Sequence, residues 1–462
     1  MSNTAIDRTS HVDIIENPDV KSFLDNCKFM VEPTGKELDD VISHFVAVPD
    51  AEYELPQKII SIDGSNYEAS VRKEMPFTKV GFVKISNLLL KRNAYKNLSH
   101  GRFVNPFEVA KLSRDNTSLS FAFPSANMRY KGEVSVRDGF RRALDEALYN
   151  CRFDDSDPST SVRTTLFRLA SHREENQEND KLTLFKCPSC GVEKIELWDI
   201  PEKQLCPHCK KVVYPSDCLR IWEDVGDAGS NQAALTRFTN VFMHILIVHY
   251  IRFLKEKSPD SYLNALSDLC FIVNGPLAVF GNPAWIHSCI LKYLYDINQE
   301  LTSSDRAPIM VLGILKNGAV CDYFKLIGDS IPEGMLFCLS DDFRNQYITF
   351  DRDPSSTTFG SETYYGQDFL LKTKNAKLFV FNVLLPFPNK HDKEAFKIEK
   401  SKITNYRNIG TCVRLIEEFE CDLHSNSIVP VTLAQKYAAI SLKPGGKILD
   451  ILSQNILNSK GM

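Results

Sequence analysis

The sequence lacks the features that define several large classes of protein. No apolar run reaches the roughly 20 residues that a membrane span needs, because the longest, within residues 241–254, is interrupted by two histidines and Arg252. The N-terminal residues are acidic and polar rather than basic and then apolar, so we expect no secretory signal. Neither sign of charge dominates, since 55 Lys and Arg residues stand against 59 Asp and Glu residues. These absences exclude a membrane protein, a small secreted scaffold and a chain that coats nucleic acid through net charge alone.

The chain has 13 cysteines, of which four form a doubled motif and the others are scattered, mostly among apolar neighbours. A scattered thiol in such surroundings usually behaves as a small buried hydrophobe. An odd number of cysteines without a secretory signal predicts a reducing compartment, and we therefore expect a cytoplasmic protein.

The doubled motif is Cys187-Pro-Ser-Cys190 followed by Cys206-Pro-His-Cys209, a C-x2-C-x15-C-x2-C pattern. Two residues between thiolates allow one tight turn to present both sulfur atoms to one ion. Two such turns provide the tetrahedral four-sulfur set that Zn²⁺ prefers, and they leave no coordination position open for water. The motif therefore predicts a structural zinc ribbon over residues 183–218.

Patterns typical of strands and of helices alternate along the rest of the chain, which predicts an α/β fold with a mixed sheet. Residues 152–182 carry few large apolar side chains and predict a linker or a long surface loop. The predicted strands cover residues 58–63, 78–90, 268–280, 309–314 and 377–386, and the predicted helices cover 136–149, 231–254, 413–419 and 432–440.

Charge is unevenly distributed near the N-terminus. Residues 1–57 hold twelve Asp and Glu against four Lys and Arg, whereas residues 67–114 hold ten Lys and Arg against three Asp and Glu. The basic stretch is interleaved with aromatic residues and includes Arg72, Lys73, Lys84 and Arg92. Because such side chains neutralise phosphates, they predict a DNA-binding surface. The alternative interpretation is that they form the solvated faces of strands and a loop.

Asp63 ends the first predicted strand and is followed by Gly64 and Ser65. A carboxylate at the end of a central strand is where RNase H-like enzymes hold the first ligand of a catalytic divalent ion. Asp-Gly is also a common turn. Asp63 is therefore either a candidate metal ligand or part of a tight turn.

Five segments, in order, resemble the NurA nuclease family over roughly residues 55–455. They are ISIDGS at 60–65, TRFTNVFMHILIVHYI at 236–251, FIVNGPLAVFG at 271–281, IMVLGILK at 309–316 and PVTLAQKYAAIS at 430–441. The resemblance implies an RNase H-like mixed sheet flanked by helices, a homodimer, and work with a HerA-type hexameric ATPase. It also implies degradation of DNA ends with Mn²⁺ or Mg²⁺. Lys316, at the end of the fourth segment, joins the candidate DNA-binding residues.

The resemblance also assigns the positions of the nuclease site. The first aspartate of the family matches Asp63. Its helix glutamate falls at Met243, its second aspartate at Asn274 and its C-terminal histidine at Gln435. None of these three replacements can carry a negative charge, whereas Mg²⁺ and Mn²⁺ select charged oxygen ligands and two-metal hydrolysis needs carboxylates to hold the ions. The resemblance therefore implies a DNA-processing subunit whose catalytic site is reduced or lost.

Two other interpretations stay open. In the first, the helix glutamate of the family has been matched to the wrong residue of this sequence. Asp145 or Glu146 in the predicted helix 136–149 then supplies the missing acid, and the protein is an active Mn- or Mg-dependent nuclease. In the other, it is a zinc-ribbon interaction protein with no role on DNA.

For the leading hypothesis we expect an N-terminal helical segment over 1–54, a NurA-like core over 55–182 and 219–462, and the ribbon inserted between them. DNA, a HerA-type ATPase and a second copy are the expected partners, in DNA repair or phage defence.

Overall fold

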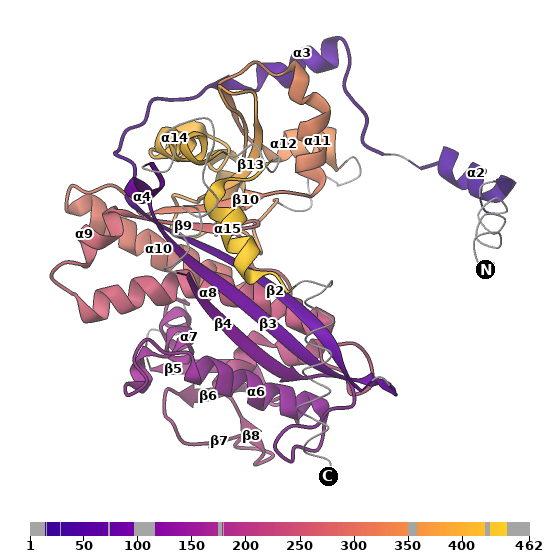
Figure 1. The fold of residues 1–462 in the computed structure, drawn as a ribbon, viewed down its shortest axis with the longest axis vertical. Helices are drawn as coiled ribbons and strands as arrows, with labels where there is room; N and C mark the ends of the chain where they lie inside the picture. Colours follow the sequence, from indigo (N-terminus) through magenta and orange to yellow (C-terminus); the bar gives the residue numbers. More distant parts are fainter. Residues whose placement is uncertain are drawn as a thin grey trace.

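The computed structural model describes residues 14, 16–27, 29–72, 74–96, 116–173, 178, 180–349, 358–420 and 426–440. Within these residues one sheet has nine strands in the order β1-β11-β12-β13-β10-β9-β2-β3-β4 (Figure 1). Its strands are β1 (Val46–Ala47), β2 (Lys58–Arg72), β3 (Met75–Lys91), β4 (Asn116–Pro124), β9 (Leu269–Asn274), β10 (Met310–Leu315), β11 (Met335–Cys338), β12 (Gly366–Lys372) and β13 (Leu378–Leu384).

The centre of this sheet combines antiparallel and parallel pairing. β2 and β3 form a long antiparallel hairpin that β4 extends, whereas β9 runs parallel to β2, and β10 parallel to β9. β9 and β10 are continuous apolar runs that are buried except at their last residues, as expected of parallel strands covered on both faces. The predicted α/β class, a mixed sheet flanked by helices, is confirmed.

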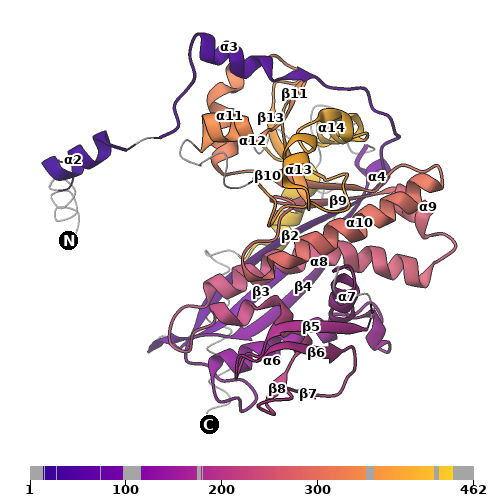
Figure 2. The same ribbon diagram turned by 180° about the vertical axis from the view of Figure 1, so that it is seen from behind.

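Helices cover both faces of the sheet. α8 and α10 lie on one face (Figure 2), and α14 and α15 lie on the other (Figure 1). The longer helices are α6 (Val136–Asn150), α7 (Val162–Ala170), α8 (Gln232–Lys257), α10 (Ile286–Ser303), α11 (Ala319–Ile327), α14 (Ile409–Phe419) and α15 (Val429–Ala438). The shorter ones are α2 (Pro18–Asp25), α3 (Lys36–Ser43), α4 (Arg92–Lys96), α9 (Tyr262–Ser267), α12 (Asp341–Phe343) and α13 (Lys393–Glu399).

The two faces of β2 bury two separate cores, because successive side chains of a strand point to opposite faces. Ile62 packs with Ile85 of β3 in the core under α8 and α10. Ile59 packs with Leu88 of β3 in the core under α14 and α15. Any side chain of β2 can therefore be assigned to one face by its position in the strand.

α8 is long and apolar enough to cross a membrane by length and composition, the one such helix in the part of the chain that the structure describes. However, 78% of its apolar window is buried inside the protein. A helix that is covered by protein on all sides is apolar all round, so α8 is a core helix here.

The linker predicted over residues 152–182 is wrong. This segment contains α7, whose Val162, Leu166 and Phe167 are fully buried in the core under α8. α7 packs against α8 and α10. The prediction failed because the nine apolar-rich residues of α7 are flanked by two polar segments that dominate the composition of the window.

The tight turn predicted at Asp63-Gly64-Ser65 is also wrong. β2 runs through these residues without interruption and ends at Arg72, paired to β3 throughout. It is the parallel partner β9 that ends here. Gly64 serves close packing instead, because a Cβ atom at this position would lie 2.5 Å from Thr239 Cγ2 of α8.

The burial of α7 makes a direct prediction. We expect Phe167→Ala to lower the free energy of unfolding by about 3–5 kcal/mol, because it removes a fully buried ring from the core. Phe77→Ala is the matched control, since Phe77 is 74% exposed and its loss should change stability by less than about 0.5 kcal/mol. Urea denaturation of both variants measures the difference. Equal stability of the two variants would mean that residues 152–182 do behave as a linker.

Candidate functional site

Three neighbouring parallel strands bring one functional group each to the same place in the sheet. Ile62 of β2 pairs with Val273 of β9, so Asp63 lies beside Asn274, the last residue of β9. Asn274 in turn pairs with Ile314 of β10, and Lys316 follows directly after that strand. The carboxyl ends of parallel strands are where α/β proteins gather functional side chains, and this is the candidate site.

Asp63 is the buried acid of the site. Its side chain accepts a 2.8 Å hydrogen bond from the backbone N–H of Gly64, and it is hydrogen-bonded to the side chain of Asn274. Because a carboxylate only accepts, the Asn274 amide is the donor. Burial raises the pKa of Asp63 to about 6, although the two hydrogen bonds and the nearby Lys316 act in the opposite direction. The hydrogen bonds and Lys316 therefore offset only part of the cost of burying the Asp63 carboxylate.

Lys316 links this acid to the helix above it. Its ammonium donates a 2.6 Å hydrogen bond to Gln435 Oε1 of α15. Burial lowers the pKa of Lys316, and the charge of Asp63 opposes that shift. The structure therefore brings together Asp63 from within β2, Asn274 and Lys316 from the ends of β9 and β10, and Gln435 from α15.

Met243 lies on the other face of β2. Its sulfur would be 3.2 Å from a Cβ atom at Gly64, whose neighbour Asp63 points away from α8 because strand side chains alternate. Met243 is 6% exposed and packs in the core under α8. An apolar side chain there completes the core rather than the polar site.

Asp145 and Glu146 are not brought together with Asp63. Asp145 pairs with Arg163 of α7 at 3.4 Å and accepts the backbone N–H of Ser216 at 3.2 Å. The α6 helix that carries both acids packs on β4, two strands from β2 in the sheet.

Glu146 is held by its own neighbours on and beside α6. It accepts hydrogen bonds of 2.8 Å from both Tyr130 and Lys131 and pairs with Arg142 at 3.2 Å. These bonds lower the pKa of Glu146 even though burial raises it. The contacts of both acids are those of structural ion pairs.

The candidate DNA-binding residues have different environments. Lys84 of β3 pairs opposite Ser65 of β2, so it lies on the same face as Asp63. Arg72 ends β2 near the tip of the hairpin. Arg92 is buried and donates two hydrogen bonds, of 2.6 and 2.8 Å, to the Glu418 carboxylate, which makes it a structural residue. Lys73 lies outside the described residues.

Ser65 belongs to the site but was missed by sequence reasoning. Its hydroxyl donates to the backbone oxygen of Ala438, the last residue of α15, and accepts the N–H of Ile440 at 3.1 Å. Ser65 thereby anchors the end of the helix that carries Gln435. The available signal was the two-residue spacing from Asp63, which places both side chains on one face of a strand.

The divalent ion that a nuclease of this kind requires does not fit these residues. Asp63 is the one carboxylate of the described site, and Asn274 turns an amide donor toward it. The Lys316 ammonium adds a positive charge beside it. Mg²⁺ and Mn²⁺ need several oxygen ligands, preferably charged, and a neighbouring ammonium repels them.

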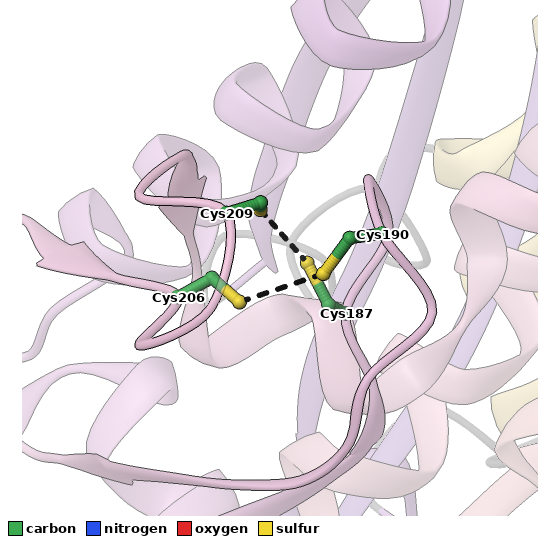
Figure 3. Close-up of side chains that lie close together, drawn as sticks. All are labelled: Cys187, Cys190, Cys206 and Cys209. Carbon is green, nitrogen blue, oxygen red and sulfur yellow. Dashed lines mark hydrogen bonds between the residues drawn. The ribbon is translucent and has the colours of Figure 1, made fainter.

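The four motif cysteines, by contrast, converge on one point (Figure 3). Cys187 and Cys190 lie between β5 (Lys181–Lys186) and β6 (Glu193–Trp198), and the other two lie between β7 (Gln204–Leu205) and β8 (Val212–Val213). All four sulfur atoms are within 4.8 Å of one another. The Cys187–Cys209 and Cys190–Cys206 sulfur pairs are 3.8 and 3.7 Å apart.

These distances fit a tetrahedral metal. A Zn–S bond of about 2.3 Å places the sulfur atoms of a tetrahedron about 3.8 Å apart. The geometry is therefore compatible with a zinc ribbon. The ribbon also packs on the rest of the protein, since Leu184, Ile195 and Cys206 are buried in the same core as α7 and α8.

A nine-stranded mixed sheet flanked by helices on both faces defines the chain as an α/β protein. The sequence profile of the NurA domain matches residues 57–405, and the chain belongs to the NurA family. The crystal structure of the NurA nuclease from Sulfolobus solfataricus is similar at 9% identity, covering 99% of this chain and 98% of that one, with a TM-score of 0.31. A second NurA crystal structure is 11% identical over 98% and 96% of the two chains, with a TM-score of 0.27. None of the curated proteins matches the chain.

The environment of Asp63 predicts how stability depends on pH. Because burial raises its pKa to about 6, the folded protein keeps a proton that the unfolded chain, with a pKa of about 4, releases. The stabilising contribution of Asp63 is therefore complete below pH 4 and is lost as the pH rises through 6. We expect Asp63→Asn to raise the free energy of unfolding at pH 8 by up to about 3 kcal/mol and to change it little at pH 4.

Urea denaturation at both pH values measures this effect, with the exposed Asp260→Asn as the control. A variant that is less stable than the wild type at pH 8 would mean that the Asp63 anion stabilises the fold, as a bound cation would require.

The cysteine cluster predicts one zinc ion per chain, bound by four thiolates. We expect Cys206→Ser to lose this metal. The variant should also lower the thermal midpoint of the whole protein, because the ribbon packs in the core under α8 and α10. Elemental analysis and a thermal melt measure the two effects. Cys27→Ser is the matched control, since Cys27 is exposed and lies outside the cluster, and it should keep its zinc. Full metal content in Cys206→Ser would refute the four-sulfur site.

Proposed function

We propose that this NurA-family chain is a DNA-processing subunit whose metal-dependent nuclease site has been lost. The observation that carries the proposal is that the residues beside Asp63 at the ends of β9 and β10 are Asn274 and Lys316, an amide and an ammonium rather than carboxylates. The amide and the ammonium take the place beside Asp63 that a divalent cation takes in an active nuclease site. Asp63 remains, therefore, as a member of a metal-free polar network.

The charges support this proposal. Two carboxylates on adjacent strand ends repel each other and are stable together only when a cation lies between them. An aspartate beside an asparagine and a lysine has no such requirement. The hydrogen bond from Lys316 to Gln435 also ties the network to α15, which in the resemblance carries the histidine of the nuclease site.

We further propose that the subunit works on DNA as a homodimer with a HerA-type hexameric ATPase in the cytoplasm, in DNA repair or phage defence, with a structural zinc in its ribbon. The face of the β2–β3 hairpin that carries Asp63 also carries Lys84, and Arg72 lies toward its tip. These two cations, together with Lys316, form the proposed DNA-contacting surface. Arg92 is not part of it, because Glu418 occupies its guanidinium.

The competing proposal is an active Mn- or Mg-dependent nuclease in which Asp63 and Glu146 or Asp145 hold the ions. The contacts favour the first proposal, because Asp145 pairs with Arg163 and Glu146 with Lys131. The same experiment separates the two.

Digestion of labelled single- and double-stranded DNA with Mn²⁺ or Mg²⁺, with and without the ATPase, tests the proposal. We expect equal, background cleavage by the wild type and by Asp63→Ala, while both still bind DNA. Cleavage that the wild type performs and Asp63→Ala does not would overturn the proposal.

A gain of metal binding provides the converse test. We expect the double variant Asn274→Asp with Lys316→Ala to bind Mn²⁺ at least tenfold more tightly than the wild type, because it gains one carboxylate and loses one ammonium. Loss of the electron paramagnetic resonance signal of free Mn²⁺ reports the binding. Asn264→Asp, on the exposed side of α9, is the control for an added acid elsewhere. Equal Mn²⁺ affinity in all three proteins would contradict this account of the site.

A further inference from the structure

A cavity of about 510 Å³ lies among the end of α7, the start of α10 and the segment before α13. It belongs to the face of the sheet that α8 and α10 cover (Figure 2), opposite the face of α15 and Asp63. Its size is that of pockets that hold small molecules. The cavity is therefore separate from the candidate site around Asp63.

The lining of this cavity is strongly cationic. Four positive side chains line it, those of Arg173, Lys292, Lys390 and Lys393, together with three histidines, and no carboxylate is among the lining residues. Of the four, Lys292 is hydrogen-bonded to Asp296 one turn along α10.

The other cations have few negative partners. Arg173 lies over the ring of Trp285, 4.8 Å from its centre. Arg173 and Lys393 have no carboxylate among the other residues that line the cavity. Uncompensated cations in one cavity repel each other, and an anionic ligand would relieve that repulsion.

Lys390 is a buried cation of the cavity whose hydrogen bonds are incomplete. Its ammonium donates hydrogen bonds to two backbone oxygens, those of Gly360 at 2.9 Å and Tyr364 at 2.6 Å. These bonds use two of its three protons, and the third has no partner among the described residues. Burial and the charge of Lys400 lower the pKa of Lys390 to about 7, although Glu362 opposes this. An anion in the cavity would complete the hydrogen bonds of this ammonium.

The α10 helix adds to the positive field. Ser288, Leu291 and Lys292, in its first two turns, line the cavity. The N-terminal end of an 18-residue helix carries a partial positive charge that attracts anions.

We propose that this cavity binds a phosphate group, either that of a nucleotide or that at the phosphorylated end of a nucleic-acid strand. A phosphate monoester carries up to two negative charges and three acceptor oxygens, which matches several separate donors better than one carboxylate does. The volume leaves room for the nucleoside attached to it. This site is independent of the loss of the nuclease site, because it shares no residue with the network around Asp63.

Isothermal titration of the full-length protein with AMP and with adenosine tests the proposal. A second arm compares a short single strand that carries a 5′-phosphate with the same strand that ends in a 5′-hydroxyl. We expect binding of AMP but not of adenosine, or a preference of at least tenfold for the phosphorylated strand. The first result identifies a nucleotide as the ligand and the second a strand end.

The variants Arg173→Gln and Lys393→Gln each remove one exposed cation and should weaken phosphate-dependent binding about tenfold. Lys325→Gln, an exposed lysine of α11 that pairs with Asp322, is the matched control and should bind as the wild type does. Asp63→Ala should also leave this binding unchanged, which separates the cavity from the proposed function. Binding that ignores the phosphate, or that survives in both cavity variants, would overturn the proposal.

Discussion

The central constraint in this structure is the burial of one carboxylate on β2, where the parallel strands of the nine-stranded sheet meet the β2–β3 hairpin. Asp63 is 5% exposed, and a buried anion must be neutralised, paired or hydrogen-bonded. The backbone N–H of Gly64, the ends of the neighbouring strands and the helix that crosses them supply these partners. Asn274, Lys316 and, through the lysine, Gln435 fill these positions. An amide as the first neighbour and an ammonium as the second give this carboxylate partners from within the chain.

The architecture was largely predictable from the sequence, because its main elements have strong periodic patterns. The 26-residue α8, the buried runs of β9 and β10 and the doubled Cys-x-x-Cys motif each carry their signal within a short window. The failures were of two kinds. The short buried helix α7 was hidden by its polar flanks, and Asp63-Gly64 was read as a turn although β3 pairs with it throughout. In both cases tertiary packing decided the structure over local composition.

The candidate site was only partly predictable. The positions of Asp63, Asn274 and Gln435 came from a family resemblance, and the structure places them in one network. The donor role of the Asn274 amide and the tie between Ser65 and α15 depend on contacts between segments more than 200 and 370 residues apart. The role of Arg92 was misassigned for the same reason, since its partner Glu418 lies 326 residues away. The sequence shows that Arg92 is charged, but not that Glu418 neutralises it in the folded protein.

The position of β9 beside β2 has a consequence for how the chain is made. The backbone N–H of Gln57, just before β2, bonds to Asp268, 211 residues later, so the central parallel pair cannot close until both segments have left the ribosome. At about 5–20 residues per second, one edge of the long β2–β3 hairpin stays open for roughly 10–40 s. The cysteine ribbon lies wholly inside that interval of synthesis. The four cysteines are therefore synthesised before β9, so a metal ion can bind to them before the sheet is complete.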